Sequence, residues 1–165
     1  MYLERFMENI RKNLGFKKGG FSLENKKEIY LNEDFYKIDI EGKNENYYLW
    51  GSRCKNCGEI YFPKKIINFC GNCNKEELEV IKLSNFGKIA GYTIAYQKPA
   101  GGYYKGMVPY AYGFVDLPEG VRVQTQFIGN HNDLKIGKTV KLEVKKIGID
   151  KEGNTLLTYV FCINN

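Results

Sequence analysis

The second half of the chain alternates apolar and polar residues, a pattern typical of half-buried β-strands. In Val121–Ile128 every second residue is apolar or threonine, and Arg or Gln stands between them. The same kind of pattern predicts four further strands, at Val80–Tyr96, Tyr110–Leu117, Val140–Lys145 and Thr155–Ile163. The first of these is long and is expected to bend or bulge at its glycines.

Five antiparallel strands within residues 80–165, the first of them long and bent at glycine, fit a small Greek-key barrel of the OB type. An open sandwich or an SH3-like barrel fits the same periodicity. The short turns Pro118–Gly120 and Gly153-Asn154 join neighbouring strands. We therefore predict an OB-fold domain over residues 80–165.

The chain begins with a different period. Apolar residues recur at three- and four-residue spacing from Leu3 to Leu14, which predicts a helix that ends at Gly15. The pattern then weakens, with a short helix expected near Lys26–Leu31 and a short strand at Tyr36–Ile40. Residues 1–46 are interpreted as a helical arm and linker. An isolated helix of this length is marginal in water, so its apolar face must pack on its own domain or on another subunit.

Four cysteines lie between the arm and the strands, within residues 47–79. They form two C-x2-C pairs, Cys54/Cys57 and Cys70/Cys73, with twelve residues between the pairs. Two such pairs supply four thiolates for a tetrahedral metal site, each pair forming one knuckle of a ribbon. The sequence therefore predicts a rubredoxin-like zinc ribbon. Zn²⁺ is the expected metal, and iron fits the same ligands.

The residues that follow each pair agree with this prediction. Gly58 and Asn74 stand where a knuckle turns back and needs positive φ, which both residue types tolerate. Four thiolates leave no open coordination position for water or substrate, so the predicted site is structural rather than catalytic. Buried thiols or disulfides are the alternative for these cysteines.

Composition places the protein among compact globular domains. The chain has 165 residues, of which 43% are hydrophobic and 15% aromatic, enough for a packed core. No apolar run approaches the ~20 residues of a membrane span, and the N-terminus lacks a signal pattern. We expect a cytoplasmic protein with no membrane partner. That reducing compartment favours metal ligation over disulfides.

The net charge of +6 is concentrated towards the C-terminus, where residues 81–165 hold eleven basic and six acidic residues. Such an excess suits a polyanion, either a nucleic acid or a phosphorylated cofactor, and an ordinary lysine-rich surface is the alternative. Near the ribbon, Lys64 and Lys65 either offset the charge of the thiolates or bind a ligand phosphate.

The sequence offers little for independent catalysis. His131, the single histidine, lies in a loop-like segment, and Cys162 lies in the last predicted strand as a small core residue. The G-x-S-x-G, P-loop and G-x-G-x-x-G motifs are absent from the sequence, and no nucleophile–base pair stands out. We therefore predict no catalytic residues, and no activity of the chain alone.

The stretch from Gln97 to Tyr112 is rich in glycine, tyrosine and lysine. Such a loop is able to lay an adenine or an acyl chain against tyrosine rings while lysines meet phosphate. A flexible barrel loop without a ligand is the alternative. The candidate ligand-binding residues of the chain are Lys64, Lys65, Lys98, Tyr103, Tyr104 and Lys105.

In order along the chain, these parts resemble a known family of zinc-ribbon plus OB-fold proteins, domain of unknown function thirty-five. The resemblance covers about Tyr47–Asn165. It is carried by an ordered set of short segments: Leu49–Gly58 with the first knuckle, Tyr61–Pro63, the second knuckle, Phe86–Lys88, Pro109-Tyr110 and Ile136–Lys138. The pair Lys64-Lys65 stands where the family usually has a single basic residue after Phe-Pro.

The resemblance implies a non-catalytic accessory subunit that pairs with a thiolase-type or related condensing enzyme, or with a hydratase, in a hetero-oligomer. In that role the chain is a scaffold that helps to complete a CoA or acyl-CoA site, and the catalytic residues belong to the partner. The alternative is a nucleic-acid-binding zinc-ribbon and OB-fold module, because barrel, ribbon, basic excess and tyrosines are also suitable for that task.

Overall fold

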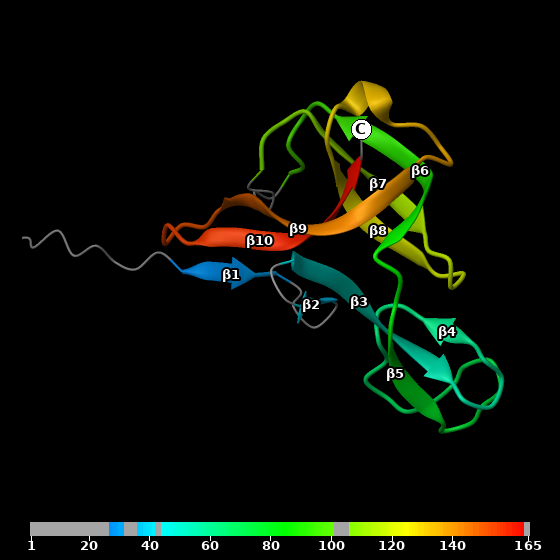
Figure 1. Ribbon diagram of the computed structural model, residues 1–165. Helices are drawn as coiled ribbons and strands as arrows, with labels where there is room; N and C mark the ends of the chain where they lie inside the picture. The colour runs from blue at the N-terminus through cyan, green and yellow to red at the C-terminus, as the bar shows by residue number, and fades with distance from the viewer. Residues whose placement is uncertain (1–26, 32–35, 42–43, 101–105, 164–165) are drawn as a thin grey trace, which may run out of the picture.

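The computed structural model describes residues 27–31, 36–41, 44–100 and 106–163, which form strands and one short 3₁₀-helix (Figure 1). The elements are β1 (Glu28–Tyr30), β2 (Tyr36–Glu41), β3 (Asn44–Cys54), β4 (Ile60–Tyr61), β5 (Leu78–Lys82), β6 (Phe86–Ala95), β7 (Tyr110–Asp116), β8 (Arg122–Ile128), η1 (His131–Asp133), β9 (Thr139–Ile149) and β10 (Thr155–Ile163). The fold is therefore mainly β, as predicted. The helix expected over Leu3–Leu14 lies outside the described residues.

Strands β6 to β10 close into a barrel. Around it, β6 pairs with β7, β7 with β8, β8 with β10, β10 with β9, and β9 again with β6. All of these pairs are antiparallel except β8 and β10, which run parallel, with Phe127 beside Phe161. This is the strand order of the OB fold. The predicted five-stranded OB-like barrel is confirmed.

The alternation in the sequence is what fills this barrel. Along β7 and β8 every second residue is buried, and Val115, Val123 and Phe127 are at most 1% exposed. Where β6 pairs with β7, a Cβ atom added to Gly113 would lie 2.1 Å from the carbonyl oxygen of Gly91. The register of the two strands also shifts between Ile89 and Gly91, the bulge expected from the glycines of this strand.

The cysteine-bearing block forms a second, smaller sheet below the barrel (Figure 1). Its central strand is β3, which pairs with β2 along its first half and with β4 and β5 along its second half. Cys54 is the last residue of β3, so this strand ends at the first knuckle.

The ribbon and the barrel share one core. Leu49 of β3 and Leu83, which follows β5, are at most 3% exposed and belong to the same apolar cluster as the barrel residues. The amide of Leu83 donates to the carbonyl of Leu49 at 2.9 Å. A second contact joins the two parts: the ring of Phe62, which follows β4, packs edge-to-face on Tyr159 of β10, with centroids 6.5 Å apart.

One strand prediction and one helix prediction need correction. The stretch Val80–Tyr96 is not one bent strand, because it breaks at Leu83–Asn85, and β5 pairs with β3 of the ribbon while β6 belongs to the barrel. The helix expected near Lys26–Leu31 is instead β1, which runs parallel to β10. The edge of β10 supplies backbone partners to this segment, and such tertiary pairing outweighs a weak local helix pattern. The strand expected at Tyr36–Ile40 is confirmed as β2.

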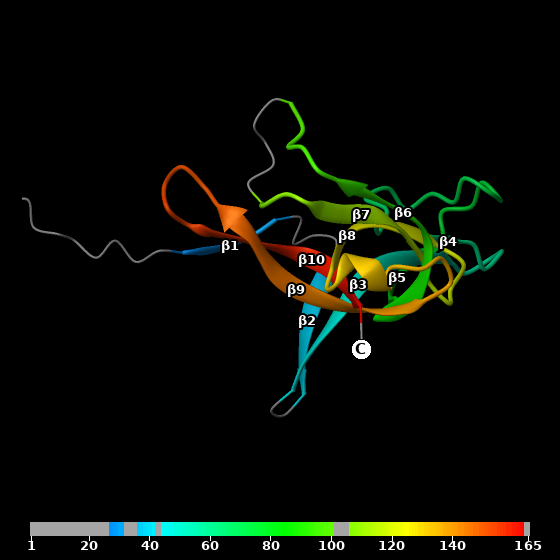
Figure 2. The same cartoon turned by 90° about the horizontal axis from the view of Figure 1, so that it is seen from above.

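Two hairpins project from the body of the molecule in different directions. Figure 2 shows the β9–β10 hairpin extending to one side, with β1 alongside it, and the β2–β3 hairpin extending away at a steep angle. Among the described residues, no helix has the length and apolar character needed to cross a membrane.

Candidate metal centre and ligand groove

The sulfur atoms of Cys54, Cys57, Cys70 and Cys73 all lie within 4.8 Å of one another. The Sγ atoms of Cys54 and Cys73 are 3.6 Å apart, and so are those of Cys57 and Cys70. Four sulfurs at about 2.3 Å from a central zinc ion would be about 3.8 Å apart along each edge of the tetrahedron. The cluster therefore fits a metal ion bound by four thiolates.

The backbone holds the two knuckles in matching conformations. In the first, the amide of Cys54 donates to Glu59 at 2.8 Å, and the amide of Gly58 donates to Cys54 at 2.9 Å. In the second, Cys70 donates to Lys75 and Asn74 to Cys70, at the same two distances. Gly58 has φ of 78° and Asn74 has φ of 58°, the positive values expected from the sequence.

The environment of the four sulfurs is unequal. Cys54 and Cys70 are buried, Cys73 is half-buried and Cys57 is exposed. The hydroxyl of Tyr61, in β4, lies 3.2 Å from the Sγ of Cys70. This hydrogen bond is the main reason why the pKa of the Cys70 thiol falls to about 6, and the same bond raises the pKa of Tyr61. The lowered pKa favours the thiolate form of Cys70, which is the form that binds metal.

The two lysines proposed to meet phosphate lie next to this centre. The Nζ of Lys65 lies 3.9 Å from the centroid of the Tyr61 ring and donates to the carbonyl of Phe69 at 3.3 Å. The backbone amide of Lys65 donates to the buried hydroxyl of Ser52. Lys64 is half-buried, and its amide donates to Trp50. The ammonium of Lys65 is therefore engaged with the ribbon itself.

The other candidate ligand residues lie in the connection between β6 and β7. Lys98 is exposed there, whereas Tyr103, Tyr104 and Lys105 lie outside the described residues. At the end of this connection, Met107 and Pro109 line an open groove of about 650 Å³.

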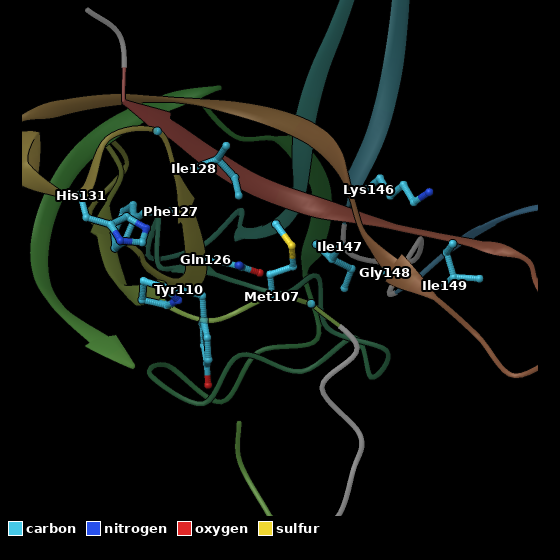
Figure 3. A pocket seen from close by; sticks show the side chains of 13 residues that line it. Met107, Tyr110, Gln126, Phe127, Ile128, His131, Lys146, Ile147, Gly148 and Ile149 are labelled. Carbon is cyan, nitrogen blue, oxygen red and sulfur yellow. The ribbon is translucent and has the colours of Figure 1, made fainter. Parts of the chain in front are cut away.

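The groove lies between the start of β7, the end of β8 and the outer part of β9. Figure 3 shows Met107 and Ile147 close together in its middle, with Tyr110 and His131 towards one end and Ile149 towards the other. Phe127 and Ile128 add to the mainly apolar lining, which also includes Gln126 and Lys146. Sequence reasoning found the loop but missed the strand residues, because they read as ordinary members of a half-buried alternation.

His131 and Cys162 are the two remaining side chains that were considered as reactive groups. His131 opens η1 at one end of the groove. Cys162 is 9% exposed in β10, and burial raises the pKa of its thiol to about 11. A thiol in that state is a poor nucleophile at neutral pH.

Comparison with known proteins agrees with this architecture. Residues 45–79 match the sequence profile of the rubredoxin-like zinc ribbon domain of ChsH2, and residues 80–145 match its C-terminal OB-fold domain. Together with the converging cysteines, the first match indicates a structural zinc site.

Relatives match over most of their own length. The benzoylsuccinyl-CoA thiolase subunit BbsA of Thauera aromatica is 32% identical over 132 residues, which cover 80% of this chain and 86% of that protein. A DUF35 domain-containing scaffold protein of Methanocaldococcus jannaschii is 36% identical over 117 residues, 70% of this chain and 79% of that protein. These relatives do not favour the nucleic-acid alternative.

A solved structure supports the fold. The Ltp2-ChsH2(DUF35) aldolase aligns with a TM-score of 0.53 at 24% identity, over 69% of this chain and 84% of that one. From the two domain matches and the relatives that share most of its length, this chain belongs to the DUF35 family, in which a rubredoxin-like zinc ribbon precedes an OB-fold domain.

Proposed function

We propose that this chain is a non-catalytic accessory subunit of a thiolase-type acyl-CoA enzyme, in which it holds the catalytic partner and contributes to the CoA or acyl-CoA site. The observation that carries the proposal is the match to BbsA, a protein named as a thiolase subunit, over 86% of the length of BbsA. The described residues add a metal-binding scaffold and an apolar groove, and catalysis is assigned to the partner.

The metal in this proposal is a structural Zn²⁺ bound by Cys54, Cys57, Cys70 and Cys73. The sulfur separations support it, and so does the burial of two of the four ligands. We divide the chain into an arm over residues 1–46, a ribbon over 47–79 and an OB-fold domain over 80–165. The pairing of β5 with β3 carries the ribbon sheet slightly further, to Lys82.

The ligand in this proposal is a CoA ester shared with the partner. The groove beside Met107 and Ile147 offers an apolar surface to an acyl or pantetheine chain. Lys98 in the adjoining connection is exposed, and with Lys64 and Lys105 it is suited to the CoA phosphates. Tyr103 and Tyr104 are assigned to the adenine ring. Lys65 is assigned a smaller share, because its ammonium already contacts Tyr61 and Phe69.

Co-purification tests the partner. The tagged chain, expressed in its native host, should retain a subunit of the thiolase family in a complex that survives gel filtration. The same complex should show acyl-CoA condensing or cleaving activity, and the isolated chain should show none. A chain that purifies alone, or with bound nucleic acid, would contradict the proposal.

Calorimetric titration of CoA into the assembled complex tests the ligand residues. A lysine contact to phosphate near the surface is worth up to about 1 kcal/mol, so Lys64→Ala and Lys98→Ala should each weaken CoA binding up to about fivefold. Tyr103→Ala/Tyr104→Ala should weaken it further through lost ring stacking. Lys135→Ala, an exposed change between η1 and β9, is the matched control. Unchanged affinity in all of the test variants would leave only the scaffold role.

A further inference from the structure

The hydroxyl of Tyr61 lies beside the metal centre but is not one of its ligands. Its oxygen is 3.2 Å from the Sγ of Cys70, which is fully buried. A metal-bound thiolate carries no proton, so in the loaded site the hydroxyl must be the donor and the sulfur the acceptor. From this contact we infer that Tyr61 is an outer-sphere positioning residue of the metal site. The inference rests on the proposed binding of metal by the four cysteines.

Backbone pairing fixes where Tyr61 stands. It lies in β4 and is paired with Ser52 of β3, two residues before the ligand Cys54. The hydroxyl therefore reaches from the strand that follows the first knuckle to a sulfur of the second knuckle. One side chain thus links the two halves of the site without touching the metal.

The ammonium group of Lys65 lies over the ring of Tyr61 and strengthens its hydroxyl as a donor. The ammonium lies 3.9 Å from the centroid of the Tyr61 ring and is anchored by the carbonyl of Phe69. A cation over the face of a phenol withdraws electron density from the ring, which makes the hydroxyl a stronger donor. Its position also places positive charge close to a centre that carries a net charge of −2 when four thiolates hold one Zn²⁺. Lys65, the second lysine after Phe62-Pro63, thus acts on the metal site through Tyr61.

A donor to a buried thiolate should affect both retention of the metal and the electronic state of the sulfur. Outer-shell partners of metal ligands typically change metal affinity by about 10- to 100-fold. Loss of the hydroxyl leaves the Cys70 thiolate buried without this donor. The filled orbitals of the sulfur then rise in energy, and charge transfer from sulfur to metal requires less energy.

The test uses the full chain with Tyr61→Phe, which keeps the ring and removes only the hydroxyl. Tyr92→Phe is the matched control, because the Tyr92 hydroxyl donates to the carbonyl of Leu134 in the barrel, at 2.9 Å. Competition with a chromogenic chelator should show Zn²⁺ binding at least tenfold weaker in Tyr61→Phe than in wild type, and unchanged in Tyr92→Phe. In the Co²⁺-loaded protein, the sulfur-to-cobalt band should move to longer wavelength in Tyr61→Phe alone.

A second variant keeps the inference falsifiable if Tyr61→Phe does not fold. Lys65→Met retains the length of the side chain and should shift affinity and band in the same direction by a smaller amount. Wild-type affinity and spectrum in every folded variant would overturn the inference while leaving the metal site intact. Failure of the wild-type chain to bind Co²⁺ or Zn²⁺ would overturn the metal assignment itself, so the two failures are distinguishable.

Discussion

Glu119 accepts two hydrogen bonds from Ser84, one from the backbone amide at 2.7 Å and one from the hydroxyl at 2.8 Å. Both go to the same carboxylate oxygen. Ser84 lies in the short connection between β5 of the ribbon and β6 of the barrel, and Glu119 lies in the turn between β7 and β8. The carboxylate thus ties the junction of the two domains to a turn of the barrel.

Replacing Glu119 with alanine should loosen this junction. Hydrogen bonds to a charged acceptor contribute about 1.5–3 kcal/mol each when they are removed singly, and we expect Glu119→Ala to lower the free energy of unfolding by about 2 kcal/mol. Urea denaturation measures this change, and hydrogen exchange should show faster exchange of the Ser84 amide. Glu119→Gln keeps an acceptor oxygen, so its loss in the free energy of unfolding should be less than half of the loss in Glu119→Ala. Equal losses in the two variants would contradict the role given to these bonds.

Removing one sulfur ligand should abolish metal binding and destabilise the ribbon, because metal affinity is folding free energy in so small a block. We expect elemental analysis of Cys70→Ala to find far less than one metal ion per chain, and its thermal transition to be lower and broader. Cys162→Ala, a buried thiol outside the cluster, should keep its metal. Full metal content in Cys70→Ala would show that the cluster is not the binding site.

The close pairing of β6 and β7 predicts different outcomes for alanine at two of their glycines. A Cβ atom at Gly113 would lie 2.1 Å from the backbone oxygen of Gly91, whereas a Cβ atom at Gly91 would meet nothing within 4 Å. Backbone cannot yield as a flexible side chain does, so Gly113→Ala should cost at least about 2 kcal/mol of stability. Gly91→Ala should change stability by less than about 1 kcal/mol. Chemical denaturation that gives similar values for both would show that the strands separate easily here.

Tyr159 should make the fold sensitive to alkali. Burial raises the pKa of its hydroxyl to about 12 in the folded state, above the ordinary value near 10. Below pH 10 both states keep the proton and the full stability contribution is present. Between pH 10 and 12 the unfolded chain loses its proton first, so stability should fall by about 2–3 kcal/mol as pH rises.

The variant Tyr159→Phe isolates this contribution. In the wild-type protein the Tyr159 hydroxyl donates to the carbonyl of Gln124 at 3.1 Å. The variant loses this hydrogen bond, so it should be about 1 kcal/mol less stable than wild type at neutral pH. That difference should shrink or reverse by pH 12 in denaturation curves recorded across the range. Tyr96→Phe, at a side chain 72% exposed, should follow the wild-type profile. A parallel decline of wild type and Tyr159→Phe would rule out this cause.

Local signals in the sequence were sufficient for the metal cluster and for most barrel strands. Each C-x2-C pair is followed directly by Gly58 or Asn74, and these few neighbouring residues determine the turn geometry of a knuckle. β10 likewise follows its predicted bounds, Thr155–Ile163, because a turn and an apolar run define its ends. In each case the determining contacts lie close together along the chain.

Features that depend on distant partners were missed. β1 exists because the edge of β10 is free to pair with it, and nothing within Glu28–Tyr30 indicates that edge. The break after β5 depends on Leu83 entering a core made mainly by later strands, and on a carboxylate at Glu119. Tyr61 stood in a recognised motif, yet its contact with Cys70 follows from the pairing of β4 with β3.

The parallel pairing of β1 with β10 also sets an order of assembly. The amide of Lys27 donates to the side chain of Asn154, 127 residues further along the chain, while the cysteine cluster and the strands of the ribbon sheet all lie between Tyr36 and Lys82. Contacts that close short loops form faster than those that close long ones. During synthesis the ribbon sheet is complete long before β10 leaves the ribosome. β1, the first strand in the described part of the chain, is therefore among the last to pair with its neighbour.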